Sequence, residues 1–208
     1  MPVSIRCSIH RSTFPSLLLL FVVLGGLLLG EASAFRVVID PGHGGHDSGA
    51  QHGSVLEKHL ALDVSRRLAR YLNRRGIKTT YTRETGFVSL NGRVAIANRY
   101  RDAIFVSIHF NSASNRGATG IETFYYPPQS ALLAHLVQTN VIHKTRRVNR
   151  GVKHRGFRVI RGPRGPSILV EGGFLSNSRE CRRCIDKVHR QKLAEAIGHA
   201  IVRFRKVR

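Results

Sequence analysis

The sequence predicts an α/β fold: a single domain built on a mostly parallel sheet with helices on both faces. Short, almost wholly apolar segments alternate along the chain with longer segments whose apolar residues recur at helical spacing. Strands that are apolar on both sides are typical of parallel sheets, which helices cover on both faces. Residues 35–208 are enough for one domain with its own core and too few for two ordinary domains.

Each predicted element follows from local composition. Apolar segments of strand length predict strands at 35–40, 77–83, 103–108, 121–126, 157–161 and 168–170. Apolar residues at helical spacing predict helices at 57–75, 90–97, 130–144 and 187–204. Pro41 and Pro127 end the first and fourth strands. Gly76 ends the first helix as a C′ residue, and Ser89 is a suitable N-cap for the second.

Residues 1–34 predict a secretory signal peptide that is not part of the fold. Arg6 and Arg11 precede an apolar run over 17–29, and the Ala-Ser-Ala sequence at 32–34 is a pattern that signal peptidase cleaves. The alternative is an uncleaved membrane anchor, but the run is about 13 residues long and a membrane span needs roughly 20. We therefore expect an exported protein of the periplasm or cell envelope, with no transmembrane span after cleavage.

The chain is strongly basic, with a formal net charge of +22. Removal of Arg6, Arg11 and Glu31 with the signal peptide takes away two positive charges and one negative charge, which leaves +21. Such a surface is expected to bind polyanions in a salt-sensitive way. Charge alone leaves open nucleic acid, anionic lipid, an acidic wall polymer, or a solvated face with no specific partner.

Cys181 and Cys184 form a C-x-x-C pair in a chain bound for an oxidising compartment, which favours a local disulfide. A thioredoxin-like redox site is less consistent with the position of the pair, which does not open a βαβ unit. A structural zinc site would need two more ligands, and the sequence has no second C-x-x-C.

Three side chains suited to metal chemistry follow predicted strands: His43, His109 and Glu171. In parallel sheets the chemistry gathers at the carboxyl ends of the strands, so we expect these residues to meet at one edge. Glu57 begins the first predicted helix, where a carboxylate is also favoured simply by the helix dipole. A hydrolytic zinc site needs three protein ligands and a further carboxylate that moves protons. These four residues could fill those roles, which predicts a metallohydrolase.

The other histidines of the mature chain are expected not to bind metal, because a lone histidine in a loop or on a helix is usually solvated. They are His46, His52, His59, His135, His143, His154, His189 and His199.

Short motifs from about residue 36 to 205 carry a resemblance to a known family. They are Val38 to Gly45, Asp47 to Ala50, Leu56 to Lys58, Thr82-Arg83, Val88 to Leu90, Arg93 to Asn98, Phe105 to Asn111, Gly120 to Glu122, Arg150 to Lys153, Pro166 to Glu171 and Gly173 to Asn177. In this order they resemble the zinc-dependent N-acetylmuramoyl-L-alanine amidases of the amidase-3 family, which include cell-separation and sporulation wall amidases. A single Gly-His-Gly-Gly would be weak, but the set is specific.

The resemblance implies a role for each matching residue. His43, Glu57 and His109 match the Zn²⁺ ligands of the family, and Glu171 matches its catalytic glutamate. Asn111 matches a position that suggests a substrate contact. The implied fold has six strands in a layout similar to that of zinc carboxypeptidases. The implied substrate is peptidoglycan, cut at the amide between N-acetylmuramic acid and L-alanine of the stem peptide.

Two further residues have predicted roles, and two alternative functions remain open. Arg83 is expected in a structural ion pair, and Glu122 either points into the site or is a buried structural carboxylate. The first alternative function is another exported zinc peptidase on a related scaffold. The second is a basic protein that binds wall polymer or nucleic acid without catalysis. We expect a monomer that is held on anionic envelope polymers by its charge and has no specific nucleic-acid partner.

Overall fold

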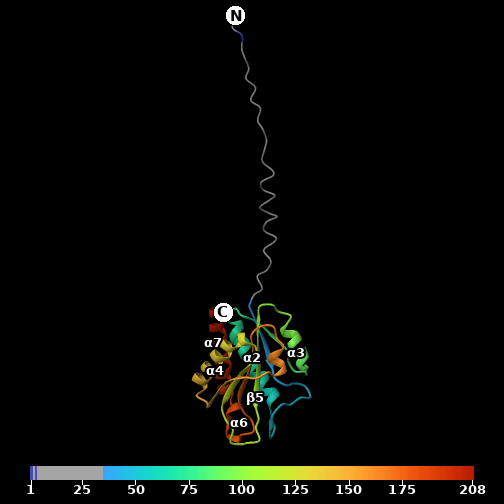
Figure 1. Ribbon diagram of the computed structural model, residues 1–208, viewed down its shortest axis with the longest axis vertical. Helices are drawn as coiled ribbons and strands as arrows, with labels where there is room; N and C mark the ends of the chain where they lie inside the picture. Colours follow the sequence, from blue (N-terminus) through green and yellow to red (C-terminus); the bar gives the residue numbers. More distant parts are fainter. Residues whose placement is uncertain (2, 4–34) are drawn as a thin grey trace. The chain divides into compact units, whose positions relative to one another are not determined.

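The computed structural model describes residue 1, residue 3 and residues 35–208 (Figure 1). Apart from residues 1 and 3, the predicted signal peptide lies outside the described residues, and so does the Ala-Ser-Ala sequence at its cleavage site. Residues 35–208 belong to one compact unit. Within the described part of the chain, no helix is both long enough and apolar enough to cross a bilayer.

The domain is built on a six-stranded sheet, as predicted. Its strands are β1 (Arg36–Pro41), β4 (Lys78–Tyr81), β5 (Ala103–Asn111), β6 (Ile121–Tyr125), β7 (Asn149–His154) and β8 (Ser167–Phe174). Their order across the sheet is β4-β1-β5-β8-β6-β7, and within it only β6 and β8 pair antiparallel. A separate two-stranded ribbon joins β2 (Gln51–His52) and β3 (Val55–Leu56).

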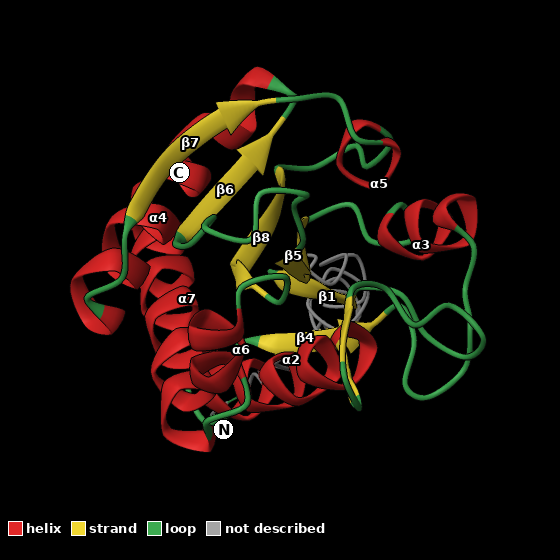
Figure 2. Ribbon diagram, turned by 90° about the horizontal axis from the view of Figure 1, so that it is seen from below, coloured by secondary structure: helices red, strands yellow, loops and turns green. Residues whose placement is uncertain are grey.

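Helices cover both faces of this sheet (Figure 2). One face carries α2 (Glu57–Asn73), α4 (Ala131–Thr145) and α7 (Lys187–Val207). The other face carries the shorter α3 (Leu90–Ala97) and α5 (Arg158–Arg161). A 3-10 turn at Pro128–Ser130 precedes α4, and α6 (Ser178–Cys184) follows β8.

Successive residues of the central strands supply two separate cores. Val37 and Ile39 of β1 pack into the larger core under α2, α4 and α7, whereas Val38 between them packs into the smaller core under α3 and α5. Phe105 of β5 belongs to the smaller core and is 1% exposed. Because side chains alternate between the faces of a strand, a strand covered on both faces must be apolar throughout.

The predicted strand over 157–161 is wrong, because residues 158–161 form α5. Val159 and Ile160 are adjacent and both buried in the smaller core, so their apolar character reflects burial and not strand pairing. The sixth strand is instead β7, which the sequence analysis missed. Its sequence, Asn-Arg-Gly-Val-Lys-His, is polar because β7 is an edge strand.

The predicted disulfide is also wrong, since Cys181 and Cys184 are both free thiols. They lie one turn apart on α6 and are buried, Cys184 completely, as part of the larger core. Burial raises the pKa of both thiols, so they remain protonated and behave as small apolar side chains.

Candidate metal and catalytic centre

The sheet brings the predicted residues together at the carboxyl ends of β1, β5 and β8. Strand pairing places His109 of β5 opposite Glu171 of β8, and Glu171 opposite Glu122 of β6. His43 lies in the loop after β1, where Gly42 N donates to Ile108 O at 2.9 Å. His109 and Glu171 lie inside longer strands than predicted, not just past their ends.

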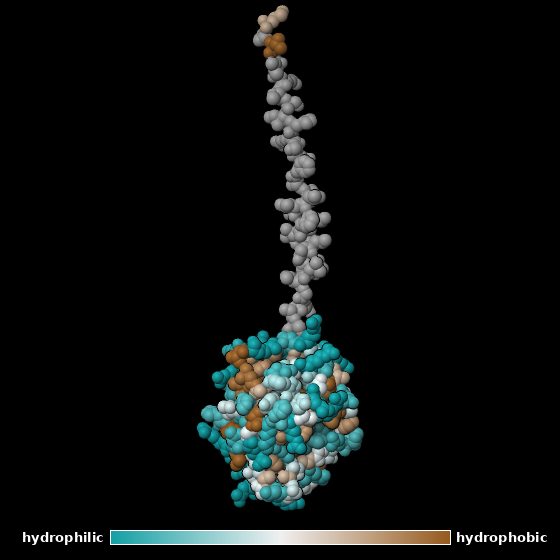
Figure 3. Space-filling view, in the orientation of Figure 1, coloured by the Kyte–Doolittle hydropathy of each residue, from teal (hydrophilic) through white to brown (hydrophobic). Residues whose placement is uncertain are grey.

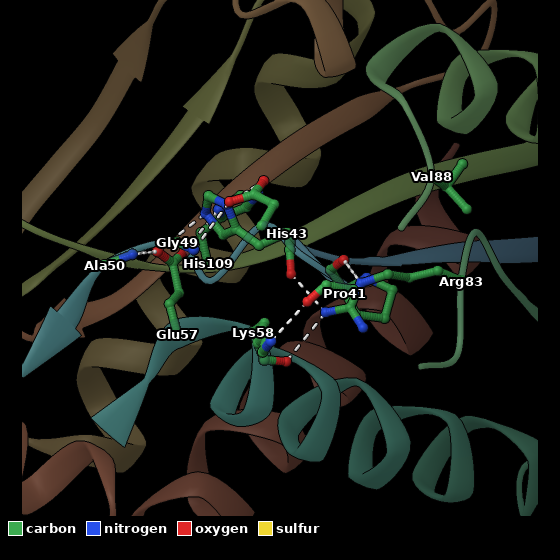
Figure 4. A network of polar contacts seen from close by, with 12 residues as sticks. Pro41, His43, Gly49, Ala50, Glu57, Lys58, Arg83, Val88 and His109 are labelled. Carbon is green, nitrogen blue, oxygen red and sulfur yellow. Dashed lines mark hydrogen bonds and ion pairs between the residues drawn. The ribbon is translucent and has the colours of Figure 1, made fainter. Parts of the chain in front are cut away.

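Glu57, the first residue of α2, contacts both histidines (Figure 4). Its Oε2 is 3.0 Å from His43 Nε2, and its Oε1 is 2.9 Å from His109 Nδ1. One donor atom from each of the three residues lies within 4.8 Å of the others. No other such group occurs in the part of the chain that the structure describes. Two imidazoles and one carboxylate are a donor set that suits zinc, so this group could hold the ion.

Hydrogen bonds fix the carboxylate of Glu57, a residue that is only 3% exposed. Oε2 accepts from Ala50 N at 2.8 Å, and Oε1 accepts from Phe110 N at 2.9 Å. Burial alone would raise the pKa of Glu57, but the hydrogen bonds and charges of His109 and His43 outweigh it and lower this pKa. The carboxylate is therefore ionised and oriented before any metal binds.

Asp47 orients His43, a role that the sequence analysis did not assign. His43 Nδ1 lies 2.9 Å from Asp47 Oδ2, so an Nδ1–H would donate to the carboxylate and leave the Nε2 lone pair facing Glu57. Carboxylates behind ligating histidines commonly set the tautomer in this way. Burial alone would lower the pKa of His43, but the pairing with Glu57 and Asp47 outweighs it and raises this pKa.

The loop that carries His43 has an unusual backbone conformation. His43 has φ 60°, a left-handed value that is uncommon outside glycine and that clusters at functional sites. Gly42 allows the His109 ring to lie against the backbone, because a Cβ there would be 2.4 Å from His109 Cε1. Gly49, with φ +65°, leaves room for Glu57 Oε2, which a Cβ would approach to 2.5 Å.

We predict that Gly42→Ala displaces the His109 ring and weakens Zn²⁺ binding about 10- to 100-fold, the size of loss seen when groups that orient ligands are removed. Competition with a chromophoric chelator measures this affinity. Gly86→Ala is the control for introducing a methyl group, because no atom lies within 4 Å of a Cβ there and its backbone is not left-handed. Equal affinities for wild type and Gly42→Ala would contradict the packing argument.

Glu171 is a carboxyl group without a partner among the described residues. Its side chain is partly exposed, but Oε2 is buried and accepts no hydrogen bond from them. Burial, followed by the charges of Glu57 and Glu122, raises the pKa of Glu171 well above its usual range. An unpaired buried carboxylate is costly, and a positive ion held by the neighbouring triad would reduce this cost. The site therefore fits a bound zinc ion.

The expected ion pair of Arg83 is wrong. Its guanidinium donates to backbone carbonyls, those of Pro41 at 2.9 Å and Gly42 at 2.6 Å among them. Burial, then the nearby charge of Arg93, lowers the pKa of Arg83 to about 10. The ion pair beneath the loop is instead formed by Arg93 and Asp40, which were not singled out, at 2.7 Å.

A cleft of ≈ 310 Å³ opens beside His43 and His109. Phe87, Val88 and Leu90, which precede or begin α3, line it together with Val159 of α5. Phe87 and Leu90 are exposed, so an apolar wall flanks the histidines on the face of the sheet that α3 and α5 cover.

The sequence and the fold both match known amidases. Residues 37–203 match a family profile described as N-acetylmuramoyl-L-alanine amidase. The chain is 34% identical to the N-acetylmuramoyl-L-alanine amidase LytC of Bacillus subtilis, over 81% of this chain and 35% of LytC. It is 32% identical to the probable cell wall amidase LytH of Staphylococcus epidermidis, over 81% of this chain and 57% of LytH.

Solved structures of amidases have the same fold as this chain. An N-acetylmuramoyl-L-alanine amidase from Clostridium difficile 630 superposes with a TM-score of 0.81 at 33% identity, covering 84% of this chain and 98% of that one. The catalytic domain of CwlV from Bacillus (Paenibacillus) polymyxa var. colistinus gives 0.81 at 31% identity, covering 84% and 99%. The chain spans about a third of the length of LytC and little more than half of LytH, but nearly all of the two solved chains. The chain therefore belongs to the amidase-3 family of N-acetylmuramoyl-L-alanine amidases.

Proposed function

We propose that residues 35–208 hydrolyse the amide between N-acetylmuramic acid and L-alanine in peptidoglycan, with a zinc ion held by His43, Glu57 and His109. The observation that carries the proposal is the triad of donors in a chain of this family, with Glu171 paired opposite His109 and its buried Oε2 without a partner among the described residues. LytC and the two solved structures are named as amidases of this type, which supports the same substrate here.

The metal ligands, Glu171 and Asp47 have different roles in the proposed hydrolysis. A zinc ion bound by the triad supplies Lewis acidity at the scissile carbonyl and lowers the pKa of water. Glu171 accepts a proton from the attacking water on a carboxylate oxygen and returns it to the departing amine of L-alanine. Burial raises the pKa of Glu171 and a cation held by the triad would lower it, and these opposing effects suit a group that must both accept and release a proton. Asp47 keeps His43 in the tautomer that a metal ligand needs.

Purified peptidoglycan tests the proposal directly. The protein loaded with Zn²⁺ is expected to release soluble stem peptides that begin with L-alanine, identified by mass spectrometry, and a chelator should abolish their release. New peptide N-termini elsewhere in the stem would instead identify the alternative zinc peptidase. Binding to peptidoglycan without any released peptide would favour the non-catalytic binding protein.

We further propose that residues 1–34 are a signal peptide and that the mature chain acts as a monomer at the cell envelope, where a role in cell division follows from the resemblance. The basic charge supports retention on anionic envelope polymers, and the view in Figure 3 is largely hydrophilic. Retention should then fall as salt rises. Asn111 remains a predicted substrate contact, although its Nδ2 already donates to Glu122 Oε1 at 2.8 Å.

A further inference from the structure

Two cations lie on β7, the edge strand that only β6 separates from β8, the strand of Glu171. Arg150 and Lys153 belong to β7, and both contact Glu122 of the neighbouring β6. Arg150 Nε is 2.9 Å from Glu122 Oε2, and Lys153 Nζ contacts the same oxygen. Because Glu122 pairs with Glu171 across β6 and β8, this group adjoins the proton-transferring carboxylate.

The group is held rigidly by its surroundings. The Glu122 side chain is 4% exposed and accepts from Asn111 on one oxygen and from both cations on the other. The Arg150 guanidinium lies 4.7 Å from the centre of the Phe174 ring, and Lys153 Nζ lies 5.7 Å from that of Phe124. Glu122 is therefore a buried structural carboxylate that positions the two cations.

The two cations keep donors for an external ligand. Their side chains are 34% and 41% exposed, and Lys153 uses its ammonium only for Glu122 among the described residues. Two positive charges face one negative charge, so the group carries a net charge of +1. A carboxylate could therefore bind without displacing Glu122.

The two sides of the centre differ in chemistry. Next to the histidines, Phe87, Val88 and Leu90 line the apolar cleft at the start of α3, which packs on β1 and β5. On the β6–β7 side stand Arg150 and Lys153, with His109 and Glu171 between the two sides in strand order. The proposed substrate also differs on its two sides. The sugar on one side of the scissile amide has no charged group next to that bond, whereas the stem peptide on the other side carries free carboxylates.

Resting on the proposed function, we propose that Arg150 and Lys153, positioned by Glu122, form a subsite that binds a carboxylate of the stem peptide. In this arrangement the stem peptide, which leaves after cleavage, lies on the β6–β7 side of the centre. The enzyme should then prefer stem peptides whose carboxyl groups are not amidated. Hydrogen bonds between charged groups are the strong class, and a preference of about tenfold or more in kcat/KM is expected.

The test compares one peptidoglycan preparation before and after its carboxyl groups are converted to amides with a carbodiimide and ammonia. The quantity measured is the ratio of the initial rates of stem-peptide release from the two substrates, at limiting substrate. Wild type should favour the untreated polymer about tenfold or more, and Lys153→Met should reduce this ratio severalfold. Lys153→Arg should retain most of it, because the positive charge remains.

Lys144→Met is the matched control, since it removes the same charge from α4, where Lys144 Nζ lies 3.8 Å from Glu195. General attraction of a basic protein to an acidic polymer would make the two methionine variants equal, which would overturn the subsite. Equal rates of wild type on both substrates would also overturn it, while the amidase function would stand. No release from untreated peptidoglycan would instead refute the proposed function.

Discussion

Glu171→Gln is expected to lower kcat about 10³-fold or more while leaving Zn²⁺ binding intact. Glutamine has the size of glutamate but cannot accept a proton from water, and general base catalysis typically contributes 10²- to 10⁴-fold. Glu171 Oε2 has no hydrogen bond within the described chain, and the residue contributes no atom to the group of three donors, so its loss should spare the metal site. Stem-peptide release under saturating peptidoglycan measures the rate.

The matched control is Glu195→Gln, which makes the same change at a partly exposed position on α7, away from the site. Zinc affinity and thermal unfolding, measured for both variants, separate loss of catalysis from loss of the site. In the metal-free protein, burial and the charges of Glu57 and Glu122 disfavour the charged form of Glu171, so an uncharged glutamine there should leave the protein no less stable than wild type. Activity within tenfold of wild type would show that another group accepts the proton.

Arg93→Met is expected to lower the free energy of unfolding by about 3–5 kcal/mol, because it leaves the buried charge of Asp40 without its partner. The two side chains are 3% and 1% exposed, and Arg93 NH1 is 2.7 Å from Asp40 Oδ1. Arg93 also donates to the carbonyls of Pro41 and His43. The substitution should therefore also loosen the loop that presents His43.

Urea unfolding of the metal-free protein measures this effect apart from zinc binding. Arg208→Met is the control, because Arg208 forms an ion pair with Asp102 in which each side chain is 32% exposed, and exposed pairs contribute about 0–1 kcal/mol. The double variant Arg93→Met with Asp40→Asn should recover part of the loss, since the unpaired charge is gone. A loss below about 1 kcal/mol for Arg93→Met would mean that solvent reaches Asp40.

Much of the site could be predicted before its geometry was known. Strands with no polar side required a sheet covered on both faces, and such a sheet gathers the residues at its strand ends. His43, His109 and Glu171 follow from this rule, and Glu57 follows from the motif resemblance. The structure brings all four together.

The predictions that were wrong concern segments whose sequence pattern does not reveal their role in the tertiary structure. Val159 and Ile160 are apolar because they cover the sheet from α5, so a strand was predicted where a short helix packs. β7 was missed because an edge strand needs no apolar face and carries Arg150 and Lys153 instead. Cys181 and Cys184 have the spacing of a disulfide, but α6 buries both thiols in the core.

The sequence by itself determined the α/β class and the family, and it predicted the four residues that the structure brings together, because apolar periodicity and short motifs are local properties of a chain. Only the tertiary structure decided the partners of those residues: Asp47 behind His43, Arg93 on Asp40, and Glu122 beneath Arg150 and Lys153. The contacts of Arg93 and of Glu122 join residues far apart in the chain. Asp47 is only four residues from His43, but the two side chains meet across a loop in which His43 has a left-handed backbone conformation. Such contacts depend on how the strands pair, which no local pattern specifies.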